Sequence, residues 1–163
     1  MFKVGIITVS DKGSRGERED LSGKVIKEIL EKNEYSVEVW DIIPDEKEQI
    51  EEKLIDFSDN KKLDLILTTG GTGFSKRDVT PEATISVATK LVPGIAEAMR
   101  AYSMTITKRA MLSRATSVIR DDSLIINLPG SPKACRETLE YLISELDHGL
   151  KILKGQDGEC ARQ

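Results

Sequence analysis

Hydrophobic and polar residues along this chain follow two different periods. Short, dense apolar runs that are rich in β-branched residues occupy positions 3–9, 35–43 and 63–68, and a polar or glycine-containing segment follows each run. Runs of this length and composition are typical of buried β-strands. The sequence therefore predicts three strands in its first half, each with a loop directly after its carboxyl end.

Elsewhere, apolar residues recur every three or four positions, which is the spacing of one helix face. This spacing predicts helices over 20–32, 81–90, 94–104 and 133–154. A further helix is predicted to begin at Pro44 and Asp45, with Asp45 as a possible N-cap. Positions 10–20 are polar and contain glycine, so we expect a loop there.

Two more strand candidates, 116–120 and 123–127, are separated only by Asp121 and Asp122. So short a link cannot hold the crossover that parallel strands need, and it predicts a hairpin instead. The expected fold class is α/β, a three-layer α/β/α domain with a mostly parallel mixed sheet and one antiparallel strand late in the chain. We expect one domain over residues 1–155 and a frayed tail over 156–163.

Composition and charge narrow the class of protein. Of the 163 residues, 39% are hydrophobic, 32% are charged and only 4% are aromatic, which predicts a globular domain with a mostly aliphatic core. The formal net charge of −4 argues against nucleic-acid binding, because phosphate backbones attract basic surfaces. No signal peptide and no long apolar run is evident, so we expect a cytoplasmic protein without a membrane span.

The metal-binding residue types are few. The chain has two cysteines, Cys135 and Cys160, and a single histidine, His148. Their number and spacing fit neither a disulfide framework nor a zinc site. Any metal is therefore expected to be a hard cation such as Mg²⁺, bound by carboxylates and by substrate phosphates.

The turn that directly follows the third predicted strand is rich in glycine. Loops at the carboxyl ends of strands are where open α/β sheets bind ligands, and glycines let backbone N–H groups approach an anion. The alternative is a tight turn that needs glycine only for its geometry, since the spacings of the Walker A loop and of the dinucleotide fingerprint are both absent. The candidate phosphate-binding residues are Gly70, Gly71, Thr72, Gly73, Ser75 and Arg77.

Two aspartates, Asp45 and Asp78, follow the ends of two predicted strands. Asp78 precedes an expected helix entry in which Thr80 is the N-cap and Pro81 the first helical residue, so Asp78 is free to point into a site. Asp45 has the alternative role of a helix cap. The pair is a candidate Mg²⁺ site only if both carboxylates converge on one ligand, which the sequence leaves open.

Other segments supply further candidate binding residues. The loop after the first strand belongs to the same sheet edge, although it could equally be a solvated charged loop. The loop after the last strand opens a helix whose N-terminus could face an anion, and an arginine guanidinium suits phosphate. The candidates in these segments are Ser10, Asp11, Ser113, Arg114, Pro129, Gly130 and Ser131.

Taken together and in order, these motifs resemble the molybdopterin adenylyltransferases of molybdenum cofactor biosynthesis, the MogA/MoaB-like family, and the G domain of gephyrin. The similarity covers nearly the whole chain. Its most specific part is the glycine turn followed by Arg77-Asp78-Val79-Thr80-Pro81-Glu82. Further matches are Ser10-Asp11, Ile43-Pro44-Asp45-Glu46, Met111-Leu112-Ser113-Arg114 and the run 123–133.

The resemblance implies a reaction. Such enzymes transfer AMP from ATP to the terminal phosphate of molybdopterin, release pyrophosphate and require Mg²⁺. The family's two essential aspartates correspond to Asp45 and Asp78, which we assign to Mg²⁺ and triphosphate binding, because the attacking phosphate is already an anion and needs no strong base. The resemblance also implies a homotrimer and hand-over of the product to a molybdenum-insertion enzyme.

Three alternatives share the fold. A non-catalytic molybdopterin- or nucleotide-binding paralogue is suggested by Ala134-Cys135-Arg136, but the intact segment from Arg77 to Pro81 favours the enzyme. Competence-damage-type nucleotide hydrolases usually have a Gly-Gly-Leu-Gly-Pro turn and paired aspartates, from which Thr72 and Phe74 depart. Molybdenum-insertion enzymes are much longer. A scaffold role, as in gephyrin, has no sequence feature in its favour.

Overall fold

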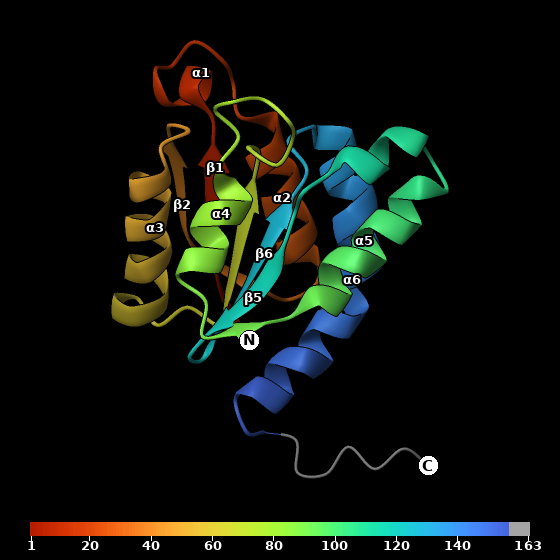
Figure 1. Cartoon of the computed structure of the whole chain (residues 1–163). Coiled ribbons are helices and arrows are strands. Elements are labelled where there is room, and N and C mark those ends of the chain that lie inside the picture. Colours follow the sequence, from red (N-terminus) through yellow and green to blue (C-terminus); the bar gives the residue numbers. More distant parts are fainter. Residues whose placement is uncertain (157–163) are drawn as a thin grey trace.

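The structure is a computed structural model that describes residues 1–156, and it is built around a six-stranded sheet (Figure 1). The strand order is β2-β1-β3-β6-β5-β4. The tail predicted for 156–163 lies outside the described residues, apart from Gln156. The strands are β1 (Lys3–Val9), β2 (Ser36–Ile43), β3 (Leu65–Thr69), β4 (Lys90–Leu91), β5 (Ser117–Arg120) and β6 (Ser123–Leu128).

The sheet is mixed, as the sequence predicts. β1 pairs in parallel with β2 and β3, and β3 pairs in parallel with β6. β5 is antiparallel to both β6 and β4, so the predicted late hairpin is confirmed. The short edge strand β4 was not predicted. The helix expected over 81–90 is shorter than predicted, because α4 (Thr80–Ser86) ends at Ser86. The chain then joins the sheet, where the Thr89 N–H donates to the Ile119 carbonyl at 2.8 Å.

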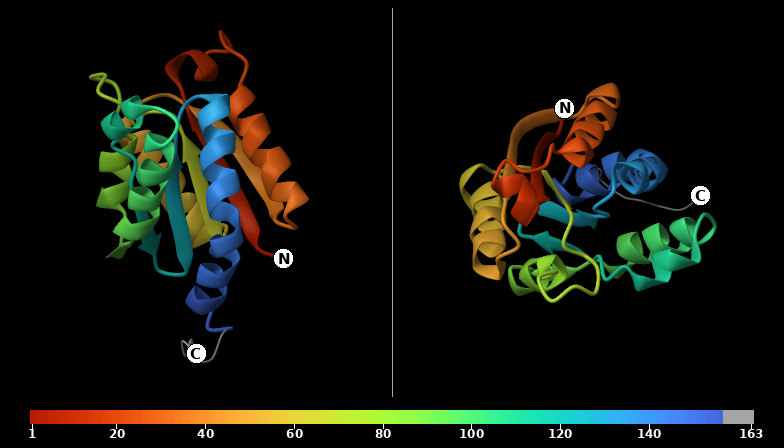
Figure 2. Two further views of the ribbon diagram at one scale, coloured as in Figure 1. Left: turned by 90° about the vertical axis from the view of Figure 1, so that its right-hand side faces the viewer. Right: turned by 90° about the horizontal axis from the view of Figure 1, so that it is seen from above.

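Helices cover both faces of the sheet (Figure 2). One face carries α2 (Leu21–Lys32), α5 (Pro93–Met104) and α6 (Pro132–Leu153). The other carries α3 (Lys47–Ile55), the π-helical turn η1 (Asp56–Asn60) that continues it, and α4. The three-layer α/β/α architecture is therefore confirmed. A 3₁₀ segment, η2 (Lys108–Leu112), connects α5 to β5.

Alternation along the central strands explains this layering. In β1, Val4 and Ile6 pack in the cluster with α2 and α6, whereas Ile7 and Val9 pack in the cluster with α3 and η1. Successive side chains of a strand point to opposite faces, so a strand with two buried faces is mostly apolar along its whole length. Each fully buried aliphatic side chain contributes about 1.5–3 kcal/mol. The continuous apolar runs of the sequence are thus the strands covered on both sides.

Three local expectations were wrong. The loop predicted over 10–20 contains a short helix, α1 (Asp11–Ser14), because the Ser10 hydroxyl accepts the Gly13 N–H at 3.0 Å and caps it. Asp45 is not an N-cap: α3 begins two residues later, and the Asp45 carboxylate binds the Asp11 N–H instead. Thr80 is the first residue of α4 rather than its cap, and Val79 precedes it.

Within residues 1–156, no helix combines the length and the apolarity that crossing a bilayer requires.

Candidate active site

A cavity of about 580 Å³ opens at the carboxyl ends of the parallel strands. Figure 1 shows α1 and the turn after β3 at this end of the sheet, opposite the N-terminus. The cavity is lined by the end of β1, the segment that enters α2, the glycine turn and the loop after β6. The topology thus brings four segments that are distant in sequence to one edge. The predicted site residues that line it are Ser10, Asp45, Gly70, Gly71, Asp78, Gly130 and Ser131.

The glycine turn is specified by both conformation and space. Gly70 and Gly71 have φ angles of 96° and 69°, in the left-handed region that favours glycine. A Cβ atom at Gly70 would overlap the Val9 carbonyl oxygen of β1, and one at Gly71 would overlap the Thr80 hydroxyl. The turn therefore lies directly against the end of β1 and the start of α4, where a side chain does not fit.

Asp45 and Asp78 line the same cavity, and their binding of one shared ligand stays a prediction. Asp45 and Asp11 hold each other: the Asp11 N–H donates to Asp45 Oδ2 at 2.9 Å, and the Asp45 N–H donates to Asp11 Oδ1 at 3.0 Å. Asp78 Oδ2 accepts the Ser75 N–H at 3.0 Å. Burial raises the pKa of Asp45, and the negative charges of Asp11 and Asp78 raise it further.

Arg77 bridges the glycine turn to the neighbouring loops. Its Nε and Nη2 atoms donate to the Asp11 carboxylate, both at 2.9 Å, and Nη2 also donates to Glu46 at 2.8 Å. Hydrogen bonding to the Arg77 guanidinium holds the pKa of Asp11 below its usual value. Neither Arg77 nor Ser75 lines the cavity. In this structure Arg77 holds Asp11 in place, and Asp11 in turn holds Asp45. A contact between Arg77 and phosphate stays a prediction.

Arg114 fastens the glycine turn from the other side. Its Nε and Nη2 atoms donate to the carbonyls of Gly73 and Asp78, both at 2.8 Å, and Nη1 pairs with Glu82. Its guanidinium is thus engaged with backbone oxygens and a carboxylate. Ser113 and Thr72 line a second, more apolar cavity of about 310 Å³, and Gly130 lines both cavities.

The loop after β6 is held in place by three side chains. Pro129 O accepts the Thr69 hydroxyl at 2.6 Å and the Cys135 thiol at 2.8 Å, and Gly130 O accepts the Ser22 hydroxyl at 2.8 Å. Ser131 caps α6 by accepting the Ala134 N–H at 3.2 Å. These hydrogen bonds fix the conformation of the loop. The amino end of the 22-residue helix α6, which follows the loop, lies at the cavity wall.

The sequence reasoning missed the side of the cavity that leads into α2. Asp20 caps α2 through the Gly23 N–H at 2.8 Å and also accepts the Trp40 indole N–H at 2.9 Å and the Thr8 hydroxyl. Ser22 and Arg18 line the same wall. The signal for Asp20 was an aspartate directly before an amphipathic helix, which marks a cap but does not reveal that the cap faces a ligand cavity.

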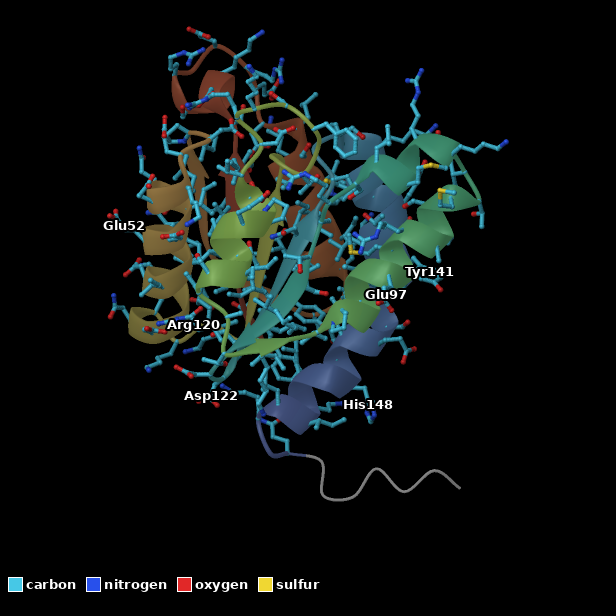
Figure 3. The ribbon with its side chains drawn as sticks, viewed as in Figure 1. Glu52, Glu97, Arg120, Asp122, Tyr141 and His148 are labelled. Carbon is cyan, nitrogen blue, oxygen red and sulfur yellow. The ribbon has the colours of Figure 1, made fainter. Side chains whose placement is uncertain are left out.

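Several charged residues lie away from this edge. Figure 3 shows Arg120 and Asp122 at the β5–β6 hairpin, and His148 on α6. Arg120 binds Asp59 of η1 at 2.9 and 2.6 Å and the Val87 carbonyl at 2.8 Å. These contacts tether the hairpin to the helices, at the end of the sheet opposite the cavity.

The cavity residues fit a hard cation that shares its ligands with a substrate. Residues 1–156 contain no cluster of three or more histidine, cysteine, aspartate or glutamate side chains that could hold a metal alone. Asp45 and Asp78 both line the cavity and supply two carboxylates. Mg²⁺ commonly binds through one or two carboxylates, phosphate oxygens and water, which matches this donor set.

The raised pKa of Asp45 makes a stability prediction. An acid whose pKa is higher in the folded than in the unfolded protein lowers the free energy of unfolding once it ionises. This loss of stability is present at pH 7. It disappears below the ordinary aspartate pKa, where the acid is protonated in both states. Asp45→Asn is therefore expected to raise the melting temperature of the ligand-free protein at pH 7 and to leave it unchanged near pH 3. Thermal unfolding at both pH values measures this.

Asp11→Asn is the control, because the pKa of Asp11 is lowered and its ionised form stabilises the fold. We expect that variant to lower the melting temperature at pH 7. A decrease in both variants would contradict the inference that the ionised carboxylate of Asp45 destabilises the fold.

Known proteins resemble this chain along most of its length. The family model described as "Probable molybdopterin binding domain" matches residues 5–148. The molybdopterin adenylyltransferase of Helicobacter pylori is 44% identical over 156 residues, which cover 93% of this chain and 88% of that protein. The residues 5–148 that the family model matches include Asp45, Asp78 and the glycine turn.

Solved structures agree with the sequence matches. The molybdopterin biosynthesis enzyme MoaB of Thermus thermophilus superposes with a TM-score of 0.91 at 46% identity, covering 98% of this chain and all of that chain. The tungsten cofactor synthesizing protein MoaB of Pyrococcus furiosus superposes with a TM-score of 0.86 at 37% identity, covering 96% of this chain and 98% of that chain. With a family model that spans most of its length and relatives at this identity, the chain belongs to the molybdopterin-binding domain family of molybdenum cofactor biosynthesis.

Proposed function

We propose that this protein is a molybdopterin adenylyltransferase, which transfers AMP from ATP to the terminal phosphate of molybdopterin and releases pyrophosphate. The observation that carries the proposal is the convergence of Asp45, Asp78 and the glycine turn on one cavity. Relatives named for this activity are 44% identical over nearly the whole chain. Together they favour this reaction over nucleotide hydrolysis and over a scaffold role.

The proposed reaction requires that the two substrates are positioned and that the negative charge of the triphosphate is compensated. A phosphate oxygen of molybdopterin attacks the α-phosphorus of ATP, and the bond from that phosphorus to the bridging oxygen of pyrophosphate breaks. The attacking oxygen is already anionic, so no side chain has to remove a proton, and the chain's single histidine, His148, lies on α6 away from the cavity (Figure 3). Holding the two reactants in line and offsetting the charge of the triphosphate account for most of the rate in phosphoryl-type transfers.

Named groups perform these tasks in the proposed site. Asp45 and Asp78 would hold Mg²⁺, whose positive charge would offset the triphosphate. The glycine turn offers backbone N–H groups to phosphate oxygens, and the amino end of α6 adds the partial positive charge of the helix dipole. Arg77 and Arg114 keep the turn in place, through Asp11 in the first case and through backbone carbonyls in the second.

Finer aspects belong to the same proposal. ATP and Mg²⁺ are the proposed co-substrate and metal, and the protein is proposed to work in the cytoplasm and to pass its product to a molybdenum-insertion enzyme. We also propose a homotrimer. The exposed apolar side chains of Ile85 on α4 and Leu91 on β4, which are 51% and 65% exposed, are of the kind that a subunit interface covers.

A second candidate is a paralogue that binds molybdopterin without adenylating it. The feature that favours this alternative is the segment Ala134-Cys135-Arg136 at the start of α6. The segment from Arg77 to Pro81 and the paired carboxylates favour the enzyme instead, because a protein that only binds the pterin has no need for two acidic groups beside an anionic ligand.

Pyrophosphate release from molybdopterin, ATP and Mg²⁺ tests the proposal. We expect release that requires both substrates and stops when Mg²⁺ is chelated by EDTA. Omission of molybdopterin is the matched control, since a nucleotide hydrolase would continue without it. Tight molybdopterin binding with no pyrophosphate from the same sample would establish the non-catalytic paralogue.

A further inference from the structure

Arg77 joins three segments at the carboxyl edge of the sheet. It lies between the glycine turn and α4, and its guanidinium donates to Asp11 at the start of α1 and to Glu46 directly before α3. Its two bonds to Asp11 reach both carboxylate oxygens, Nε to Oδ2 and Nη2 to Oδ1, each at 2.9 Å. A planar guanidinium that meets a carboxylate with two bonds fixes its orientation as well as its distance. Arg77 therefore determines how the Asp11 side chain is turned.

Asp11 passes this constraint on to Asp45. The Asp11 Oδ1 atom that accepts from Arg77 also accepts the Asp45 N–H at 3.0 Å. In return, the Asp11 N–H donates to Asp45 Oδ2 at 2.9 Å. One oxygen of the Asp45 carboxylate is thus engaged by the backbone of Asp11, so the orientation of the Asp45 side chain depends on where Asp11 lies.

The other oxygen of that carboxylate, Asp45 Oδ1, is left open. Within residues 1–156 it accepts no hydrogen bond, and it is not among the buried side-chain oxygens that lack a partner, so it is accessible to solvent. It lies beside Gly71, because a Cβ atom built on that glycine would be 3.2 Å away from it. Gly71 and Asp45 both line the cavity. The contact with Asp11 therefore leaves Oδ1 as the oxygen that is available to a ligand.

We propose that Arg77 is a positioning residue for Asp45: by fixing Asp11, it keeps Asp45 Oδ2 on the Asp11 backbone and Asp45 Oδ1 available to the proposed Mg²⁺. Outer partners of this kind orient the carboxylates that bind a metal, and the loss of one typically weakens metal binding about 10- to 100-fold. The inference rests on the proposed function, which gives Asp45 its role as a metal ligand.

The competing explanation is the one that the sequence predicted, in which Arg77 binds phosphate directly. Against it, Arg77 does not line the cavity, and its guanidinium is engaged by two carboxylates. The two explanations differ in what they expect when the metal is removed. A direct phosphate contact stabilises a bound nucleotide with or without Mg²⁺, whereas a positioning role matters only while a metal is bound to Asp45.

Binding of α,β-methylene-ATP separates the two explanations without turnover, because the methylene bridge blocks release of pyrophosphate. We expect Arg77→Gln to raise the Kd of this analogue about 10-fold in the presence of Mg²⁺ and to leave it unchanged in EDTA. An equal loss in both conditions would overturn the inference and establish direct phosphate contact. An unchanged Kd with Mg²⁺ would overturn both explanations. If the wild type binds the analogue in neither condition, the proposed function fails, and the role of Asp45 as a ligand fails with it.

A double-mutant cycle with Asp11 supplies the second test, measured as the Kd of the same analogue with Mg²⁺. If Arg77 acts through Asp11, Arg77→Gln adds no further loss once Asp11→Ala is present, whereas an independent role would multiply the two losses. Such a multiplied loss would contradict the inference. Arg15→Gln is the matched control, because Arg15 makes a two-bonded contact with Glu17 and does not line the cavity. We expect it to leave the Kd unchanged, and a loss equal to that of Arg77→Gln would assign the effect to net charge instead.

Discussion

Asp78→Asn is expected to lower the rate of pyrophosphate release at least about 100-fold without unfolding the protein, which is the order of effect seen when one preorganised electrostatic group is removed. Asparagine has the shape of aspartate, and its carbonyl oxygen can still accept the Ser75 N–H that binds Asp78 Oδ2 at 3.0 Å. The turn should therefore keep its conformation. What the variant loses is one negative charge in the proposed Mg²⁺ and triphosphate site.

Asp122→Asn serves as the control, because Asp122 lies at the β5–β6 hairpin, at the other end of the sheet (Figure 3). It removes the same charge from the same protein and should leave turnover unchanged. Initial rates with saturating molybdopterin and ATP, together with circular dichroism of both variants, make the comparison. Near-normal turnover of Asp78→Asn would show that Asp78 is outside the catalytic machinery.

Gly70→Ala is expected to lower the free energy of unfolding by about 2–5 kcal/mol. The φ angle of 96° at Gly70 already disfavours any L-residue, at about 1–2 kcal/mol. The new Cβ would also overlap the Val9 carbonyl oxygen, which belongs to a strand in the middle of the sheet and cannot move aside. Overpacking of this kind adds about 1–3 kcal/mol.

Gly16→Ala separates the two causes. Gly16 has a similar φ of 73°, but an added Cβ would meet no atom within 4 Å. We expect this variant to lose only the conformational part, about 1–2 kcal/mol. Urea unfolding of both variants measures the difference. Equal losses at the two positions would mean that close approach to β1 does not constrain the turn.

The sequence predicted most of the fold because burial on both faces of a central strand leaves a visible mark. Strands such as β1 and β6 are buried at nearly every position and apolar at most of them, and α2 and α6 show one apolar stripe each. The two-residue link at Asp121 and Asp122 was enough to predict the hairpin, because only an antiparallel pair can close so short a turn. Errors occurred where a local signal was weak, as at the two-residue strand β4, whose pairing with β5 is a tertiary contact.

In the candidate site, too, some features could be predicted from the sequence and others could not. The glycines, Asp45 and Asp78 could be selected from the sequence, because residue type and position after a strand limit what they can do. Their convergence on one cavity could not, since it depends on the order β2-β1-β3-β6 in the sheet. The cap residue Asp20 and the backbone contacts of Arg114 were equally hidden, because their partners lie 20 and 41 residues away in the chain.

By itself, the sequence thus determined the elements, the layers and the chemical groups available, because periodicity and residue type are local properties that burial and backbone geometry enforce at each position. Only the tertiary structure decided which groups share a cavity, which arginines are engaged within the protein, and that Gly71 lies against the Thr80 hydroxyl. Those relations depend on distances between segments that are far apart in the chain, and no local pattern encodes them.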